Sequence, residues 1–522
     1  GMGRRVMGRR DRTIIALLIG GTLIYILPFL NPGWQIYEDA AILFRYAEHV
    51  SGGHGIVWNI GERPVDGATD LLFMWVLAGL HLAGIQIEAA ARAASAVSHV
   101  VTVVIVYVAA RRLSAATPLA AALSAIFVAV GPAKAYIAGG FGTPLFAMCV
   151  ALMWAATLRL VQRPATPVAV LCGSLGVLAG IARPEGALLA VLVVISLFIY
   201  WRGDAARMFI WPIVATGVLF GGAYWAWRWN YFGYPLPNPF YRKGGGQIYS
   251  WNFLLTAKYG SLHIAPFLPA MVVGLWNRDT RRVTLLAALP LFGFLAAWIL
   301  LSNEMNFFRR FQYPVVAIAA MSWTMWIPDG VGAAWRSLMT RATLQRIAAG
   351  AIAVVLLAAT VAYEHRAYFP PRWQDDLFRV GAMLEPYHDR GYTVAISEAG
   401  LIPFYSKWNT IDVWGLNDQW IAHNGVVTAA YLDRRAPEVV IFRASCVPPR
   451  ARDAWEAMVR AMVDYTRSRP YVLAARPHNE SASIMYFVRS GFRDEAALES
   501  IFATLNQPAP AKPTPLPSCT ER

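Results

Sequence analysis

The 522-residue chain is too apolar for a soluble protein of its length, because 57% of its residues are hydrophobic, only 15% are charged and 20 are Trp. This composition predicts a polytopic membrane protein. The 46 Lys and Arg outnumber the 31 Asp and Glu, but the basic residues lie in short loops between apolar runs. That distribution favours membrane topology over nucleic-acid binding.

The first apolar run, Thr13 to Leu30, follows five arginines between positions 4 and 12. Positive residues stay on the cytoplasmic side, and no small-residue cleavage site follows Leu30. We therefore expect an uncleaved anchor with a cytoplasmic amino terminus.

Eleven apolar runs are long enough to cross a membrane, at about 16 to 22 residues each. They cover residues 13–30, 93–110, 116–131, 143–161, 167–182, 186–201, 208–229, 262–276, 283–301, 312–327 and 346–363. One more run, Leu71 to Gly84, is ambiguous. Arginine-rich loops alternate along the chain only if it does not cross, so we expect an interfacial or re-entrant helix there.

An odd number of crossings places the chain after about residue 364 on the outer side. We expect a helical membrane domain over residues 1–363, with an outer loop at 31–92. Residues 364–506 have globular composition and strand-like runs, which predict a periplasmic α/β or α+β domain, and 507–522 form a Pro-rich tail. Cys149 and Cys172 are expected to be packed thiols, whereas Cys446 and Cys519 could form a disulfide in this outer domain.

The adjacent carboxylates Glu38 and Asp39 begin an amphipathic stretch just after the first crossing. Acidic residues are favoured in the first turn of any helix, so one interpretation is a charge-stabilised helix start. The other is catalysis, in which a carboxylate removes a proton from an acceptor hydroxyl at the membrane surface. Two carboxylates alone would hold Mg²⁺ or Ca²⁺ only weakly. No cysteine or histidine spacing predicts a zinc site.

Other outer loops hold candidate substrate-binding residues. A glycine-rich turn carries His54, Trp58 and Asn59, and a tight turn between two spans carries Arg183 and Glu185, which could simply pair with each other. The aromatic, Pro-rich loop from Phe232 to Lys243 could bind a sugar ring and a phosphate, or form an interfacial aromatic belt; its candidates are Asn238, Tyr241, Arg242 and Lys243.

The pair Arg309 and Arg310 breaks the topological charge rule, because it lies on the outer side. An anionic ligand explains this pair, although a partner such as Glu304 would also do so. The triple glycine at 244–246 lacks the strand and helix context of a nucleotide cradle. The scarcity of ionisable residues inside the spans argues against a transporter.

Several ordered blocks resemble the GT-C superfamily of membrane glycosyltransferases, in particular the branch with the mycobacterial terminal β-(1→2)-arabinofuranosyltransferases. Members of that branch look like D-D-A-Y/F-I-x-x-R-Y-A, G-H-G-L-V-W-N-x-G-E, E-G-x-T, R-P-E-G, F-G-x-x-x-P-N-x-F-Y-x-K and R-F-x-x-P. The matching blocks here are Glu38 to Ala47, His54 to Glu62, Asp66 to Thr69, Arg183 to Gly186, Phe232 to Lys243, Arg310 to Pro314, and Glu398 to Asp418.

The chain departs from that pattern in two places. Glu38 replaces the first of the paired aspartates, so the role of catalytic base carries over more safely to Asp39. A block that looks like S-G-L-E-T is Gly139 to Thr143 here, with Gly142 in place of the acidic residue.

The resemblance implies an inverting transfer from a polyprenyl-phosphate sugar to a glycan or lipid-linked acceptor, on the periplasmic face of a bacterial inner membrane. Arabinofuranose is the expected sugar, and a GT-C mannosyl or hexosyl transferase is the alternative. The expected partners are thus the lipid donor, the acceptor and membrane lipids, and not nucleic acid.

Overall fold

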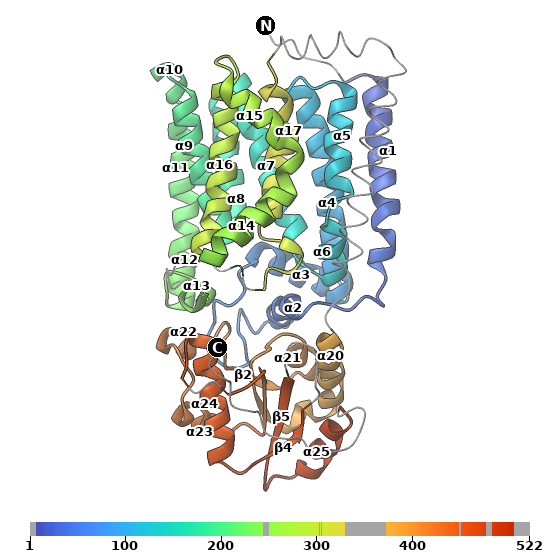
Figure 1. The fold of residues 1–522 in the computed structure, drawn as a ribbon, viewed down its shortest axis with the longest axis vertical. Coiled ribbons are helices and arrows are strands. Elements are labelled where there is room, and N and C mark those ends of the chain that lie inside the picture. Colours follow the sequence, from blue (N-terminus) through green and yellow to red (C-terminus); the bar gives the residue numbers. More distant parts are fainter. Residues whose placement is uncertain are drawn as a thin grey trace.

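The computed structural model describes residues 7–243, 250–301, 303, 305–328, 372–447, 450–476 and 483–505. It has two layers stacked along its long axis: a bundle of helices, and a smaller α/β domain formed by the carboxyl-terminal part of the chain (Figure 1). The predicted fold class, a polytopic helical membrane protein with a carboxyl-terminal α/β domain, is confirmed.

Seven helical segments of the described residues are long and apolar enough to cross a membrane. They are built from α1 (Arg9–Ile26), α4 (Ile87–Leu113), α5 (Pro118–Ala129) with α6 (Ala133–Gly139), α7 (Thr143–Gln162), α11 (Ile210–Thr216) with α12 (Gly222–Phe232), α14 (Ser250–Ile264) with α15 (Leu268–Trp276), and α16 (Arg281–Leu300). The apolar helices α8 (Thr166–Ala182) and α9 (Pro184–Tyr200) are shorter, and α10 (Asp204–Arg207) is a single turn.

Of the predicted apolar segments, one is too short to cross a membrane, one is irregular and one lies outside the described residues. The run 71–84 forms α3 (Leu71–Leu82), which at 12 residues is about 18 Å long and cannot cross a bilayer. The run 312–327 is not one regular helix: α17 (Val316–Ser322) lies between 3₁₀ turns at Tyr313–Val315 and Trp323–Trp326. The predicted span 346–363 lies outside the described residues.

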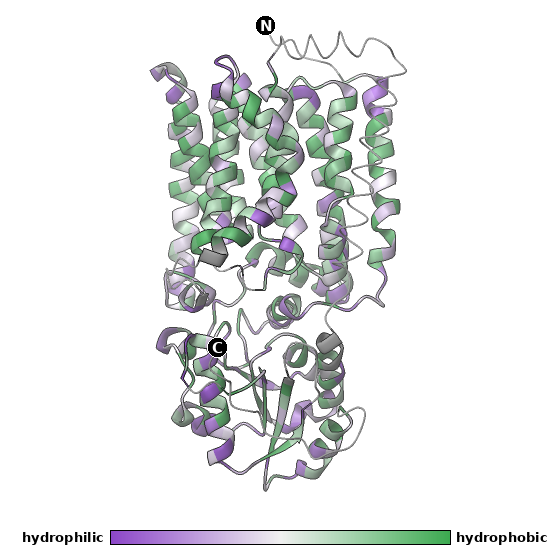
Figure 2. Cartoon of the chain, in the orientation of Figure 1, coloured by the Kyte–Doolittle hydropathy of each residue, from purple (hydrophilic) through white to green (hydrophobic). Residues whose placement is uncertain are grey.

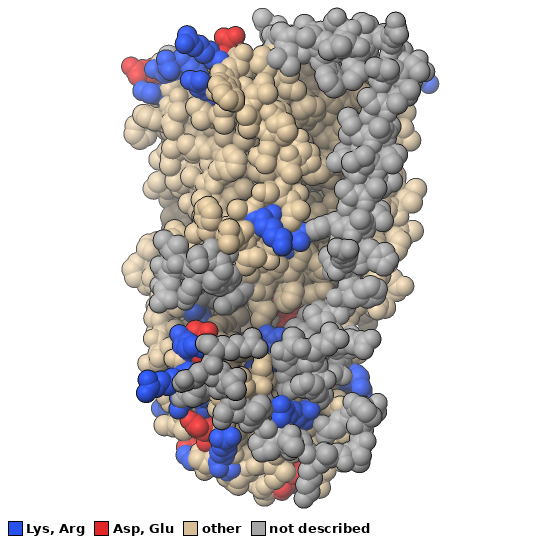
Figure 3. Space-filling view, in the orientation of Figure 1, with Lys and Arg blue, Asp and Glu red and all other residues tan. Residues whose placement is uncertain are grey.

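The helical layer is hydrophobic along most of its height (Figure 2). On the face seen in Figure 3, Lys and Arg gather at the end of the bundle around α10 and on the α/β domain, and apart from one basic cluster the surface between them is largely uncharged. This pattern fits a bundle that spans a membrane. The start of α1 lies at the end opposite to the α/β domain (Figure 1).

The α/β domain contains a five-stranded sheet in the order β2-β1-β3-β5-β4. Strands β1 (Thr393–Ile396), β2 (Asn409–Asp412) and β3 (Val439–Ala444) are parallel, whereas β5 (Ser483–Arg489) and β4 (Tyr471–Ala475) are antiparallel additions. The helices are α20 (Arg372–Leu384), α21 (Leu401–Ser406), α22 (Gln419–Asn424), α23 (Ala429–Arg435), α24 (Ala454–Ser468) and α25 (Glu495–Ala503). Parallel strands covered by helices are buried on both faces, as the near-continuous apolar run of β3 predicts.

The two layers meet at α2 (Glu38–Ser51) and α13 (Asn238–Lys243), which pack against α21 and α22 of the α/β domain. The approach is closest at Gly400, where a Cβ would lie within 2 Å of the Glu38 carbonyl oxygen. A side chain at position 400 would therefore push the domain away from α2.

Cys149 and Cys172 are buried free thiols, as expected. Cys446 takes part in a disulfide, whereas its expected partner Cys519 lies outside the described residues.

Candidate functional site

A cavity of about 400 Å³ lies beside the start of α2, and we call it the membrane-side cavity. Most of its lining is apolar, and includes Leu43, Phe141, Leu188, Trp298, Leu301 and Phe311. Five charged residues also reach it: Asp39, Asp70, Arg183, Glu185 and Arg310. Apolar walls with a few convergent charged groups are typical of a ligand site.

Asp39 and Arg310 form an ion pair at this cavity, with 2.5 Å between Oδ2 and Nη2. The Asp39 side chain is 20% exposed, whereas the Arg310 side chain is 8% exposed. The guanidinium also lies 4.1 Å from the ring centroid of Phe141. Among the described residues, Arg310 Nη1 has no hydrogen-bond acceptor although it is buried. Arg310 therefore has a donor left for an anionic ligand.

The loop that carries Arg310 is held by a buried amide network. Asn306 donates to Gln312 Oε1 at 2.8 Å, and Gln312 donates to Asn303 Oδ1 at 2.9 Å. Phe308 and Arg309 have φ values of +55° and +59°, in the left-handed region that costs energy for residues other than glycine. With this backbone, the two arginines point apart. Arg310 lines the cavity, whereas the Arg309 guanidinium lies 5.4 Å from the ring centroid of Tyr259 and does not line it.

Arg183 is held between two carboxylates at the same cavity. Its guanidinium donates to Asp70 Oδ1 at 2.5 Å and to Glu185 Oε1 at 3.1 Å. The expected pairing of Arg183 with Glu185 is therefore present, and Asp70 is an additional partner that the sequence interpretation missed. Asp70 directly precedes the apolar helix α3, and that position was the available signal.

Glu38 faces the α/β domain instead of the membrane-side cavity. Its carboxylate accepts hydrogen bonds from the backbone N–H groups of Gly400 and of Leu401, the latter at 2.8 Å. Burial, reinforced by the nearby Glu398 carboxylate, raises the pKa of Glu38 to about 8. Glu38 thus keeps its proton at neutral pH and cannot accept another, which leaves Asp39 as the candidate base.

A second cavity of about 380 Å³ lies on the other side of the start of α2, and we call it the domain-side cavity. It is formed at the carboxyl ends of β1 and β2 and by β3, and its lining includes Glu398, Asp412, Trp414, Arg443 and Trp455. Asp39, Ile42 and Leu416 line both cavities. Asp39 therefore stands where the two cavities adjoin.

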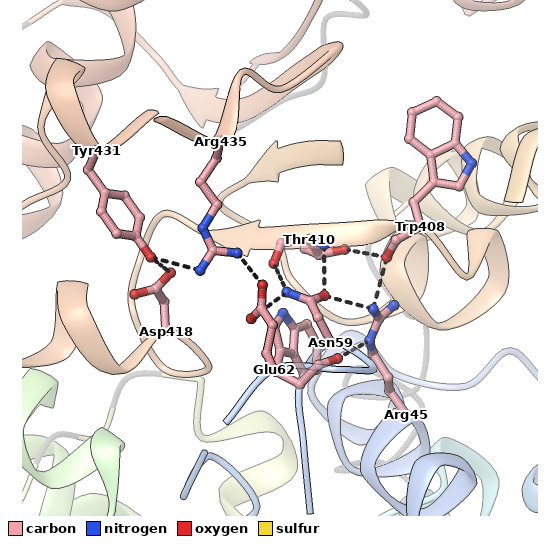
Figure 4. Close-up of polar contacts among 9 residues, drawn as sticks. Arg45, Asn59, Glu62, Trp408, Thr410, Asp418, Tyr431 and Arg435 are labelled. Carbon is pink, nitrogen blue, oxygen red and sulfur yellow. Dashed lines mark hydrogen bonds and ion pairs between the residues drawn. The ribbon is translucent and has the colours of Figure 1, made fainter. Parts of the chain in front are cut away.

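The His54–Glu62 block fastens the two layers together (Figure 4). Asn59 is 2% exposed and exchanges hydrogen bonds with the backbone of Thr410, while Arg45 donates to the Trp408 and Pro403 carbonyls. Trp58 is buried, with its ring 4.8 Å from the Arg45 guanidinium. Trp58, Asn59 and the exposed His54 line neither of the two cavities described above.

The aromatic loop from Phe232 to Lys243 also contacts the α/β domain. Tyr241 lies 4.3 Å from the ring of His423, and the Arg242 guanidinium lies 4.0 Å from the ring centroid of Trp414. Asn238 is buried, and its backbone N–H donates to the Asp66 carbonyl at 3.0 Å. Pro237, Pro239 and Phe240 of this loop line the membrane-side cavity, whereas the Lys243 side chain lies outside the described residues.

Gly142 lies where the resembling family has an acidic residue. A Cβ at Gly142 would lie 2.7 Å from Cγ of Phe73, so this chain fills the space of that side chain with an aromatic ring.

The two carboxylates at the start of α2 have different partners, and the described residues contain no group of three or more His, Cys, Asp or Glu that could hold a metal ion. These residues do not fit a shared cation site, and we derive no step through one.

Comparisons with known proteins bear on the fold. Residues 364–484 match a domain of unknown function, DUF8728. No curated protein sequence matches the chain. ArnT from Cupriavidus metallidurans, in its structure with undecaprenyl phosphate, superposes with a TM-score of 0.58 at 14% identity, covering 90% of this chain and 97% of that one.

The Archaeoglobus fulgidus oligosaccharyltransferase has a TM-score of 0.50 at 12% identity, covering 83% of this chain and 69% of that one. The mycobacterial arabinofuranosyltransferase AftD has a TM-score of 0.50 at 16% identity, covering 94% of this chain and 42% of that one. The chain has the GT-C fold. In this GT-C fold, both cavities lie at the junction of the helical bundle with the α/β domain.

Proposed function

We propose that the protein is an inverting glycosyltransferase that moves a sugar, arabinofuranose, from a polyprenyl-phosphate donor to a glycan or lipid-linked acceptor on the periplasmic face of a bacterial inner membrane. The observation that carries this proposal is the Asp39–Arg310 pair, a base and a cation side by side in a largely apolar cavity at the end of a membrane bundle. ArnT, whose fold this chain shares, has been seen with undecaprenyl phosphate bound.

The chemistry needs one base and one cation. Asp39 takes the proton of the acceptor hydroxyl, whose oxygen forms a bond to the anomeric carbon of the donor. The bond from that carbon to the phosphate oxygen breaks, and its electron pair leaves with polyprenyl phosphate. Arg310 stabilises the charge on this leaving phosphate, because it lines the same cavity and its Nη1 has no acceptor among the described residues.

The lining of the membrane-side cavity suits a lipid-carried donor. Leu236 and Phe240 line it and remain 37% and 44% exposed, so apolar surface continues from the cavity to the outside. Arg183 is already neutralised by Asp70 and Glu185, and we infer that this triad shapes the cavity and orders polar sugar groups. Holding donor and acceptor together at Asp39 supplies the orientation that the transfer requires.

The test uses the full chain in lipid nanodiscs with polyprenyl-phosphoryl arabinofuranose, and measures released polyprenyl phosphate. Asp39→Asn should lower kcat by about 10² to 10⁴ and leave donor binding intact. The matched control is Asp433→Asn, which breaks an exposed pair with Arg469. Native turnover by Asp39→Asn would refute the assignment of the base. Turnover with a mannosyl donor in place of the arabinosyl donor would reassign the sugar.

A further inference from the structure

The domain-side cavity has no part in the proposed reaction so far, although Asp39 lines it. We propose that this cavity is the acceptor site and that it takes the end of a neutral glycan. The inference rests on the proposed function, because it names the acceptor of that same reaction. The volume of the domain-side cavity, about 380 Å³, lies in the range of small-molecule sites.

The first argument comes from Glu398, which follows β1 at the sheet edge. Its side chain is 2% exposed, and its Oε1 accepts no hydrogen bond from the described residues, although Arg443 Nε lies 3.1 Å away. The ion pair with Arg443 leaves acceptor sites of this buried carboxylate unused, and an unused buried acceptor is costly. Sugar hydroxyls are donors of the right kind to satisfy it.

The second argument comes from two tryptophans. Trp414 and Trp455 are half-buried, and their ring centroids lie 5.1 Å apart at an interplanar angle of 60°. The carboxylate of Asp412 fixes the turn that carries Trp414, since it accepts from the backbone N–H groups of Trp414, Gly415 and Asn417. Aromatic faces held rigidly at an angle can pack against the C–H surface of a sugar.

The third argument is the charge of the lining. Glu38, Asp39, Glu398 and Asp412 bring four carboxyl groups to this cavity, against Arg443, the one cation among its lining residues. An anionic acceptor would meet an excess of like charge, whereas a neutral polyol would not. The membrane-side cavity has Arg310 as the cation that an anionic lipid phosphate needs.

The test measures binding without chemistry, by calorimetric titration of the full chain in nanodiscs with linear pentasaccharides of arabinofuranose and, separately, of mannose. We expect one of them to bind, and Trp455→Ala to weaken its binding about tenfold. Trp455→Phe should restore most of the affinity. The matched control is Trp420→Ala, because the Trp420 ring stacks on Tyr431 at 4.5 Å and lines neither cavity.

Hydrolysis of the donor by water in the absence of acceptor reports whether Trp455→Ala is folded. Retained hydrolysis with weakened saccharide binding supports the proposal. Equal affinity in Trp455→Ala and the unchanged protein overturns it, as does binding of neither saccharide by a protein that cleaves the donor. If the unchanged protein cleaves no donor but loses saccharide binding in Trp455→Ala, the proposed transferase activity fails and the sugar site stands.

Discussion

Replacing Asn59 by Ala separates two explanations of the His54–Glu62 block. The motif resemblance makes Asn59 a substrate ligand, whereas the structure places its side chain in the contact between α2 and the edge strand β2. Asn59 Oδ1 accepts from Thr410 N at 2.9 Å and from Arg45 Nη2 at 3.1 Å, and Nδ2 donates to Thr410 O at 3.0 Å. Asn59→Ala removes these three bonds together with the one that Nδ2 donates to Glu62 Oε2 at 3.1 Å.

The size of the effect follows from what remains unpaired. Thr410 is 2% exposed, so its N–H and C=O would lose their partner in a buried position, at about 1 to 3 kcal/mol each. Arg45 Nη2 keeps its hydrogen bond to the Trp408 carbonyl at 2.8 Å, so the loss of its bond to Asn59 adds little to the destabilisation. We expect a loss of about 3 kcal/mol in the free energy of unfolding, since water can enter the gap at this edge. For a domain of the size of the α/β domain, that loss lowers the melting temperature by roughly 10 °C.

The assay is thermal unfolding of the nanodisc-embedded protein by tryptophan fluorescence, together with the donor KM. Asn424→Ala is the matched control, because Asn424 is exposed and makes one hydrogen bond, to the Trp420 carbonyl. It should change the stability by less than about 0.5 kcal/mol. An unchanged melting temperature in Asn59→Ala, combined with a donor KM raised tenfold, would refute the structural role and restore the ligand role.

Three further predictions follow from single residues. The folded protein holds a proton on Glu38 between pH 4.5 and about 8 that the unfolded chain loses, so stability should fall by up to ~5 kcal/mol as the pH rises through this interval. Glu38→Gln should flatten that dependence in thermal melts, and an unchanged slope would contradict it. Gly142→Ala should cost ~1–3 kcal/mol through its clash with Phe73, and this cost should shrink when it is measured in a Phe73→Ala background, whereas Gly203→Ala, in open space, should be neutral in the same melts. Gln312→Ala should lower kcat about tenfold, by releasing the loop that aims Arg310, the proposed phosphate ligand, without changing saccharide affinity; an unchanged kcat would exclude this positioning role.

The sequence was informative where a residue's chemistry conflicts with its surroundings. Arg310 breaks the charge rule of outer loops, and Asp39 begins a helix at a membrane surface, so both were predicted as site residues. Their direct pairing across 271 positions of sequence was not predictable, because it depends on how the bundle packs. Arg443 offered the same kind of signal, a charge within the apolar strand β3, but was missed.

The assignment of His54, Trp58 and Asn59 to the substrate site stays a prediction, and local sequence could not show their contacts with the α/β domain. Polar and aromatic residues in a glycine-rich turn can serve either a ligand or a domain contact, and local sequence does not distinguish these uses. The partners of Asn59 and Arg45 lie more than 350 positions later, at Thr410 and Trp408. The predicted boundary of the α/β domain near residue 364 stays a prediction, because the described part of that domain begins at Arg372.

The start of α2 couples the membrane bundle to the α/β domain through two adjacent carboxyl groups. Glu38 is turned to the domain and holds the backbone of Gly400 and Leu401, while Asp39, one residue later, is turned to Arg310 of the bundle. Because successive helical residues point about 100° apart, a shift of the domain on Glu38 would rotate Asp39 against its arginine. The contact with the domain and the placement of the proposed base Asp39 therefore depend on the same helical turn.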